Sequence, residues 1–154
     1  FLCEDVVGTV KGIGGGNLLV CGRSQRETLA AIRLAVKEIH ALSDVIMPFP
    51  SGIVRSGSKV GSKYKPLKAS TNEKWCPSLR GQTESALQQG EQAVYEIVID
   101  GLSQSAVAAA MAAGLRAAAA APGVMRISAG NYGGKLGPYH FHLHQLEAEA
   151  KVSG

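Results

Sequence analysis

The strongest constraint on the fold is a pattern of strand, helix and strand that occurs twice along the chain. Each strand is a short, mostly apolar run, and each helix has an apolar stripe or an alanine-rich stretch. Two such units in succession are typical of the split βαβ arrangement. We therefore expect an α+β fold of the ferredoxin-like type: an antiparallel sheet with both helices on one face. The expected strands are Asn17–Gly22, Asp44–Phe49, Ala93–Asp100 and Val124–Ser128, and the expected helices are Ser24–Leu42 and Ser103–Ala121.

The ends of the chain are expected to extend this sheet. Asp5–Ile13 and Tyr139–Leu146 both have strand-like composition. The glycine-rich run Gly12–Gly16 then reads as a hairpin turn between the first two strands. A dinucleotide-binding role for this run is excluded, because it joins two strands and does not open a helix.

Length and composition limit the chain to one domain. Its 154 residues are treated as a single lobe over 1–154, and the low charged content of 18% predicts an oligomer or a partner lobe that covers part of the surface. The start at Phe1 predicts a piece of a longer protein. No segment resembles a signal peptide or a membrane span. Three widely spaced cysteines form no disulfide or zinc pattern, which favours the cytoplasm and inert thiols.

A long region at 56–90 lacks periodicity and is expected to be a binding loop or partly disordered, with Gly81–Gly90 as its mobile part. A cluster of basic residues lies at the start of this region. The cluster predicts binding of a ligand that is rich in carboxylates or phosphates; the alternative is a solvated loop that binds no ligand. Nucleic acid is disfavoured, since aromatic residues make up 5% of the chain and no nucleic-acid-binding motif is present. The basic residues of this cluster are Arg55, Lys59, Lys63, Lys65, Lys68 and Lys74.

Glu96 is the most informative single residue, because it is the one acid within an otherwise apolar run, Val94–Ile99. Neither face of that strand looks solvated, so burial is expected to raise the pKa of the Glu96 carboxyl group. A carboxyl group that titrates near neutral pH can donate or accept a proton in catalysis. The alternatives are a buried acid paired with Lys or Arg, and an acid at a strand edge that reaches water.

Three histidines, His140, His142 and His144, alternate within the last expected strand. On a strand they would share one face, with neighbours about 7 Å apart. That spacing fits poorly to one zinc ion with nitrogen ligands at about 2 Å. We therefore expect hydrogen-bonding histidines and no metal site.

Two loops have the composition of ligand-binding segments. The glycine-rich loop Ser128–Gly137 allows backbone amides to approach a ligand closely, and the loop Lys68–Asn72 offers hydroxyl and amide groups beside positive charge. Ordinary turn chemistry is the alternative for both. The candidate binding residues are Lys59, Lys63, Ser70, Asn72, Asn131, Gly133 and Lys135.

Taken in order along the chain, several segments resemble the C-terminal lobe of formylmethanofuran–tetrahydromethanopterin formyltransferase. We expect this lobe to be the distal one. The resemblance runs from the first strand to His144 and is weakest over residues 81–92. His140 and the net charge of +4 depart from the archaeal pattern and favour a bacterial, methylotroph-type source. The segments that carry the resemblance are Pro48–Val54, Ser58–Lys63, Ala69–Asn72, Val94–Ile99, Ile127–Asn131, Gly133–Gly137 and His142–His144.

The resemblance implies a cytoplasmic acyltransferase of one-carbon metabolism. It would move a formyl group between the amine of a methanofuran-type carrier and N5 of a tetrahydromethanopterin-type carrier, with both carriers as substrates and no covalently bound cofactor. The implied partners are an N-terminal lobe of the same enzyme, further copies in a homo-oligomer and the subunits of a hydrolase complex. A non-catalytic module that binds carriers or assists assembly is the alternative.

The resemblance also implies roles for individual residues. The counterpart of Glu96 is the presumed catalytic carboxylate, and formyl transfer between two nitrogens needs positioning, oxyanion donors and one proton shuttle. Lys59 and Lys63 would attract the glutamate-rich tail of a methanofuran carrier. Asn131, with the amides near Gly130 and Gly133, would contact the pterin or the formyl group.

Overall fold

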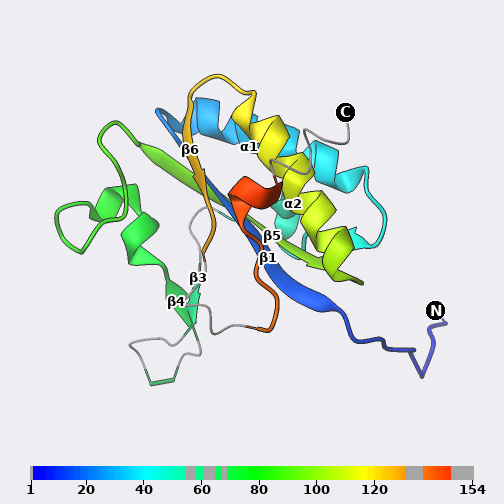
Figure 1. Cartoon of the computed structure of the whole chain (residues 1–154). Coiled ribbons are helices and arrows are strands. Elements are labelled where there is room, and N and C mark those ends of the chain that lie inside the picture. Colours follow the sequence, from blue (N-terminus) through cyan, green and yellow to red (C-terminus); the bar gives the residue numbers. More distant parts are fainter. Residues whose placement is uncertain (1, 55–57, 61–64, 67–68, 131–136, 147–154) are drawn as a thin grey trace.

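A computed structural model describes residues 2–54, 58–60, 65–66, 69–130 and 137–146. Within that part, four strands form an antiparallel sheet in the order β2-β5-β1-β6, and two long helices pack on it (Figure 1). The chain order β1-α1-β2, then β5-α2-β6, is the expected doubled unit. The bounds are β1 Ile13–Gly22, α1 Gln25–His40, β2 Val45–Ile46, β5 Ala93–Gly101, α2 Gln104–Ala119 and β6 Val124–Ser128.

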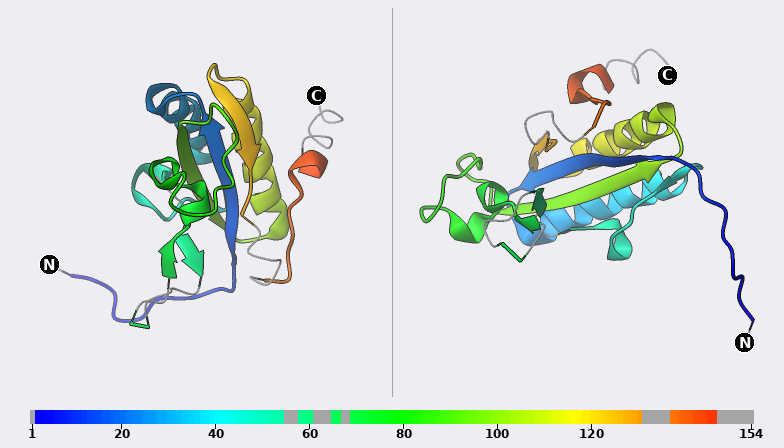
Figure 2. Two further views of the ribbon diagram at one scale, coloured as in Figure 1. Left: turned by 90° about the vertical axis from the view of Figure 1, so that its left-hand side faces the viewer. Right: turned by 90° about the horizontal axis from the view of Figure 1, so that it is seen from below.

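Both helices lie on the same face of the sheet, as Figure 2 shows. Side chains of one face of β1 and β5 are fully buried against them, among them Leu18 and Ile97. α1 and α2 also pack against each other, and at Gly114 an added Cβ atom would come within 2.8 Å of the Ile39 side chain. The predicted antiparallel sheet with two helices on one face is confirmed.

Each helix begins at the serine that its sequence indicates. The Ser24 hydroxyl accepts a hydrogen bond from the Glu27 N–H at 3.2 Å, and the Ser103 hydroxyl accepts one from the Ala106 N–H at 3.1 Å. The Glu27 carboxylate accepts from the Ser24 hydroxyl at 2.8 Å instead of from the backbone N–H expected for a capping box. Both helices therefore start where the sequence predicted them to start.

The expected strand at Asp5–Ile13 is wrong. Residues 5–12 are exposed and have no strand partner among the described residues, and β1 begins only at Ile13. The expected hairpin over Gly12–Gly16 is also wrong, because β1 runs through these glycines with a bulge between Ile13 and Gly16 in its pairing with β5. Gly15 has a φ of +89°, which favours glycine, and its N–H donates to Asp100 Oδ1 at 2.9 Å.

The expected strand at Tyr139–Leu146 is wrong as well. Residues 143–146 form a helical turn, in which the Leu146 N–H donates to the His142 carbonyl at 3.2 Å. Leu146 is buried in the core that the two helices share. Packing in this core, and not pairing at a sheet edge, therefore holds the segment. The described part of the main sheet thus contains four strands and is not extended at either end.

The region 56–90 contains more structure than a loop. Two short strands, β3 at Ser58–Val60 and β4 at Ala69–Thr71, pair in a separate two-stranded sheet that lies apart from the main one (Figure 1). Two single-turn 3₁₀ helices follow at Glu73–Trp75 and Pro77–Leu79. Across the described residues, no helix is both long and apolar enough to span a membrane.

Candidate functional site

Glu96 lies on the face of the sheet opposite the helices. Its side chain is 2% exposed and alternates in β5 with Ile97, which faces the helices. Across the sheet Glu96 pairs with Leu19 of β1, and on the other side its backbone N–H and C=O each bond to Val54 at 2.7 Å. Strand pairing on both sides therefore holds this acid in the interior of the molecule.

Asn17 is the polar partner of Glu96 in the described part of the chain. Residue 17 of β1 is diagonal to Glu96 in the sheet, and its side-chain Nδ2 donates to Glu96 Oε1 at 3.0 Å. Asn17 is 6% exposed. Its Oδ1 accepts a hydrogen bond from the Gly130 N–H at 2.9 Å. The three residues form one chain of hydrogen bonds from the strand interior to the end of β6.

Burial raises the pKa of Glu96 to about 7, while the hydrogen bond from Asn17 acts in the opposite direction. The predicted burial and raised pKa of this carboxyl group are thus features of the structure. Among the described residues its partner is a neutral amide and not Lys or Arg, and its side chain is almost fully removed from water. A carboxyl group in this state can exchange a proton near neutral pH.

A cavity of about 840 Å³ lies next to this chain of hydrogen bonds. Within the described residues, β6 pairs with β1 only from Leu19 onward. Asn17 and Gly130 both line the cavity, together with the start of β1, the start of α2 and residues 137–142. Glu96 does not line it. Asn17 therefore connects the buried Glu96 to the cavity.

A second polar cluster holds residues 75–91 against the same face of the sheet. Arg126 of β6 pairs with Glu91 through two bonds of 2.8 Å, and its guanidinium lies 4.9 Å from the Trp75 ring centre. Burial alone would raise the pKa of Glu91, but hydrogen bonds from Arg126 and the Gln88 N–H outweigh it and lower that pKa. Trp75 and Leu87 also pack against Leu19. The ion pair therefore holds residues 75–91 as a layer over this face of the sheet, beside Glu96.

The cysteine that faces this layer is unreactive in character. Cys21 is fully buried, and burial, followed by the charge of Glu91, raises the pKa of its thiol to about 12. A thiol with so high a pKa stays protonated at neutral pH. This agrees with the expectation of an inert thiol at Cys21.

The structure describes the predicted binding residues only in part. Lys59 of β3 and Ser70 of β4 are paired in register, and Asn72, which is partly buried, follows β4. Lys63, Asn131, Gly133 and Lys135 lie outside the described residues. In the rest of the basic cluster, Lys74 forms an exposed ion pair with Glu84 at 2.8 Å. The Gly130 N–H, which belongs to the amides expected to contact the pterin or the formyl group, donates to Asn17 Oδ1 at 2.9 Å.

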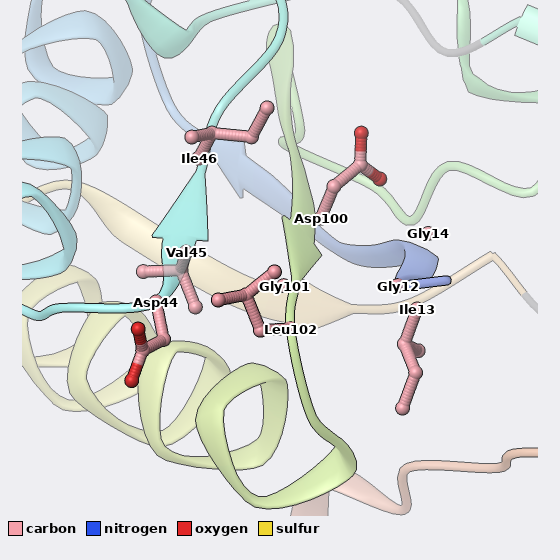
Figure 3. Close-up of a pocket in the computed structure, with 9 residues that line it drawn as sticks. All are labelled: Gly12, Ile13, Gly14, Asp44, Val45, Ile46, Asp100, Gly101 and Leu102. Carbon is pink, nitrogen blue, oxygen red and sulfur yellow. The ribbon is translucent and has the colours of Figure 1, made fainter. Parts of the chain in front are cut away.

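A smaller cavity of about 560 Å³ lies at the C-terminal end of β5 and shares Gly12–Gly14 and Leu102 with the larger one (Figure 3). It is mostly apolar and contains two acids, Asp44 and Asp100, whose carboxylates point away from each other in Figure 3. Asp100 already accepts a bond from Gly15. The two acids therefore do not form a catalytic pair, and no predicted site residue lies there.

The histidines do not share a strand face. The rings of His142 and His144 are 5.7 Å apart on a segment that enters a helical turn. Among the described residues, no group of three His, Cys, Asp or Glu side chains is arranged to hold a metal ion. His140 and His142 instead line the larger cavity.

Comparison with known proteins places this site in a family. A family model described as "FTR, proximal lobe" matches residues 1–146. This chain belongs to the formylmethanofuran–tetrahydromethanopterin formyltransferase family. The designation as a distal lobe is corrected, because the matching model is that of the proximal lobe.

Curated relatives and solved structures agree with the family model. The formyltransferase of Methylococcus capsulatus is 55% identical over 96% of this chain and 51% of its own length, and that of Methanosarcina mazei is 52% identical over 95% and 50%. The solved formyltransferase of Methanosarcina barkeri superposes with a TM-score of 0.85 at 52% identity, over 89% of this chain and 47% of that one. The chain spans about half the length of the curated relatives it matches.

One solved neighbour contains a carrier. The formyltransferase/hydrolase complex of Methylorubrum extorquens, solved with methylofuran, superposes with a TM-score of 0.79 at 48% identity, over 88% of this chain and 44% of that one. Bacterial and archaeal relatives match at similar identity, so identity does not favour either source.

Proposed function

We propose that this chain is the Glu96-bearing lobe of an enzyme that transfers a formyl group between a methanofuran-type amine and N5 of a tetrahydromethanopterin-type carrier. The observation that carries the proposal is a carboxyl group that is 2% exposed, has a pKa of about 7 and is held by one neutral amide. Family membership supplies the reaction, since the matched relatives are named for it.

In this reaction one amine attacks the formyl carbon and forms a tetrahedral adduct with a negatively charged oxygen. The attacking nitrogen must lose a proton, and the departing nitrogen must gain one. A carboxyl group with a pKa near 7 can do both in turn, because its two protonation states are almost equally populated at neutral pH. Glu96 is our candidate for this proton shuttle, and no covalent intermediate on the protein is required.

We further propose that the basic segment attracts the acidic tail of the methanofuran-type carrier. Lys59 and Lys63 are the two residues assigned this role, with Ser70 and Asn72 beside them. The pairing of Lys59 with Ser70 in register supports a common binding strip on β3 and β4. Asn131, Gly133 and Lys135 remain proposed contacts of the pterin or the formyl group.

The finer features of the protein are proposals as well. We infer a second lobe of the same enzyme as partner, because the matched relatives are about twice as long as the aligned region. A homo-oligomer, association with hydrolase subunits as in the M. extorquens complex, a cytoplasmic location and a bacterial source complete the proposal.

The test uses a chimera in which this chain replaces the matching half of the M. capsulatus formyltransferase, with which it shares 55% identity. Formyl transfer from formylmethanofuran to tetrahydromethanopterin is measured for the chimera, the intact relative and this chain alone. Turnover by the chimera within tenfold of the relative supports the enzyme. A folded chimera that binds both carriers without turnover would favour the binding-module alternative.

Charge reversal tests the basic segment. In the chimera, the double variant Lys59→Glu/Lys63→Glu should weaken binding of the methanofuran-type carrier and flatten the dependence of that binding on salt, because two attractive charges are lost. Arg33→Glu/Lys37→Glu on exposed positions of α1 is the control with the same change in net charge. Equal affinity in both double variants would reject the assigned role of Lys59 and Lys63.

A further inference from the structure

Asn17 lies between the buried acid and the cavity, and both ends of its side-chain amide are used. Gly130 N–H can only donate, so the oxygen of the amide must face it, at 2.9 Å. The –NH₂ end then points at Glu96 Oε1, at 3.0 Å. The backbone of Gly130 thus determines which end of Asn17 meets the carboxyl group.

The backbone before Asn17 is built for this placement. An added Cβ atom at Gly16 would come within 2.6 Å of Val107 of α2, so β1 approaches the helix closely at that point. Alternation along the strand then turns residue 17 to the opposite face, the one that carries Glu96. The bulge between Ile13 and Gly16 ends just before Asn17 and sets its register with β5.

We propose that Asn17 is the positioning residue of Glu96: its amide, oriented by the Gly130 N–H, holds one carboxyl oxygen of Glu96 at a fixed place beside the 840 Å³ cavity. The inference rests on the proposed function for its catalytic meaning. Its structural part concerns this chain alone, since the placement of the carboxyl group and its titration can be measured without turnover.

The chemistry of the contact predicts its effect on protonation. An N–H donor stabilises the carboxylate form more than the neutral acid, and hydrogen bonds to charged groups are the stronger ones. Among the described residues, burial and the hydrogen bond from Asn17 act on the pKa of Glu96. The described side chains around it on this face are Leu19 and Cys21 of β1, Val94 and Val98 of β5, Val54 beside β5 and the paired Arg126 with Glu91. Asn17 is therefore the contact that favours the carboxylate.

The experiment measures the titration of Glu96 in this chain by ¹³C NMR of its carboxyl carbon, assigned with Glu96→Gln. Asn17→Leu removes both hydrogen bonds at similar volume, and Asn17→Asp keeps the acceptor for Gly130 but loses the donor to Glu96. Each should raise the midpoint of Glu96 by about one pH unit or more. Thr28→Val, which removes a part-buried hydrogen bond from a fully buried residue to the Ser24 carbonyl, should leave it unchanged.

Activity supplies the second readout. In the chimera, the inflection of the pH–kcat profile that disappears in Glu96→Gln should move upward with the NMR midpoint in the Asn17 variants. An unmoved midpoint in a folded Asn17→Asp or Asn17→Leu variant would overturn the positioning role. A moved midpoint with an unmoved inflection would limit Asn17 to a structural contact. If Glu96→Gln itself turns over normally, the proposed function fails while the titration result still stands.

Discussion

At the scale of single residues, the site depends on Glu96, a buried acid of β5, and on Asn17, whose side-chain amide reaches it from β1. One acid among β-branched neighbours signals burial wherever the strand lies. Asn17 follows three glycines, which look like a turn, and its meaning depends on which β5 residue it faces. That register is set by the bulge before it, a feature of tertiary pairing. The sequence offered one signal for Asn17: it is a polar residue directly before Leu18, at the start of an apolar run.

The raised pKa of Glu96 predicts how stability depends on pH. The folded chain keeps this proton up to about pH 7, whereas the ordinary value for the group is 4.5. Between these values the folded state binds more protons, so the free energy of unfolding falls as pH rises. The total effect is at most about 3 kcal/mol, at about 1.4 kcal/mol per pKa unit. Urea unfolding of the chain from pH 5 to 8 measures it.

Glu96→Gln should remove this part of the pH dependence and unfold at higher urea than the native chain at pH 8. Glu38→Gln, at an exposed position of α1, is the control and should keep the native slope. If Glu96→Gln and the native chain have parallel profiles, then Glu96 is not protonated in the folded state at pH 5 to 7.

At the scale of elements, the doubled strand, helix and strand pattern was predicted correctly, and so was the start of each helix, at Ser24 and at Ser103. These signals are local: a serine before an apolar stripe acts through its own turn of backbone. The two outer strands were wrong because strand-like composition alone does not form a strand, which depends on the neighbours that the residues meet in the fold. Residues 5–12 find no partner in the described structure, and Leu146 gains more by packing into the helical core.

Gly22 tests the packing at the junction of β1 and α1. An added Cβ atom there would lie 2.3 Å from Thr28 Oγ1 and 2.8 Å from the Gly123 carbonyl oxygen. Gly22→Ala should therefore lower the free energy of unfolding by about 1–3 kcal/mol, the cost typical of overpacking. Gly8→Ala is the matched control, because nothing lies within 4 Å of its added Cβ atom. Equal urea midpoints for the two variants would contradict this packing.

At the scale of the whole molecule, the chain corresponds to about half of a formyltransferase. The ordered motifs of the sequence indicate the family. The structure adds the buried Glu96, its amide partner Asn17 and an adjoining cavity. Positions 131–136, which include three proposed binding residues, lie outside the described part. Their contacts therefore remain predictions, to be tested in the two-lobed context where carriers bind.

The most direct measurement of the central claim is kcat of Glu96→Gln in the chimera with the M. capsulatus half. Glutamine keeps the shape and a hydrogen-bonding group, but it cannot exchange a proton at neutral pH. We predict that the variant folds, that its KM changes little and that kcat falls about 10²–10⁴-fold, the range for loss of a general acid–base. A folded Glu96→Gln chimera with near-native kcat would show that Glu96 is a structural acid and would contradict the account.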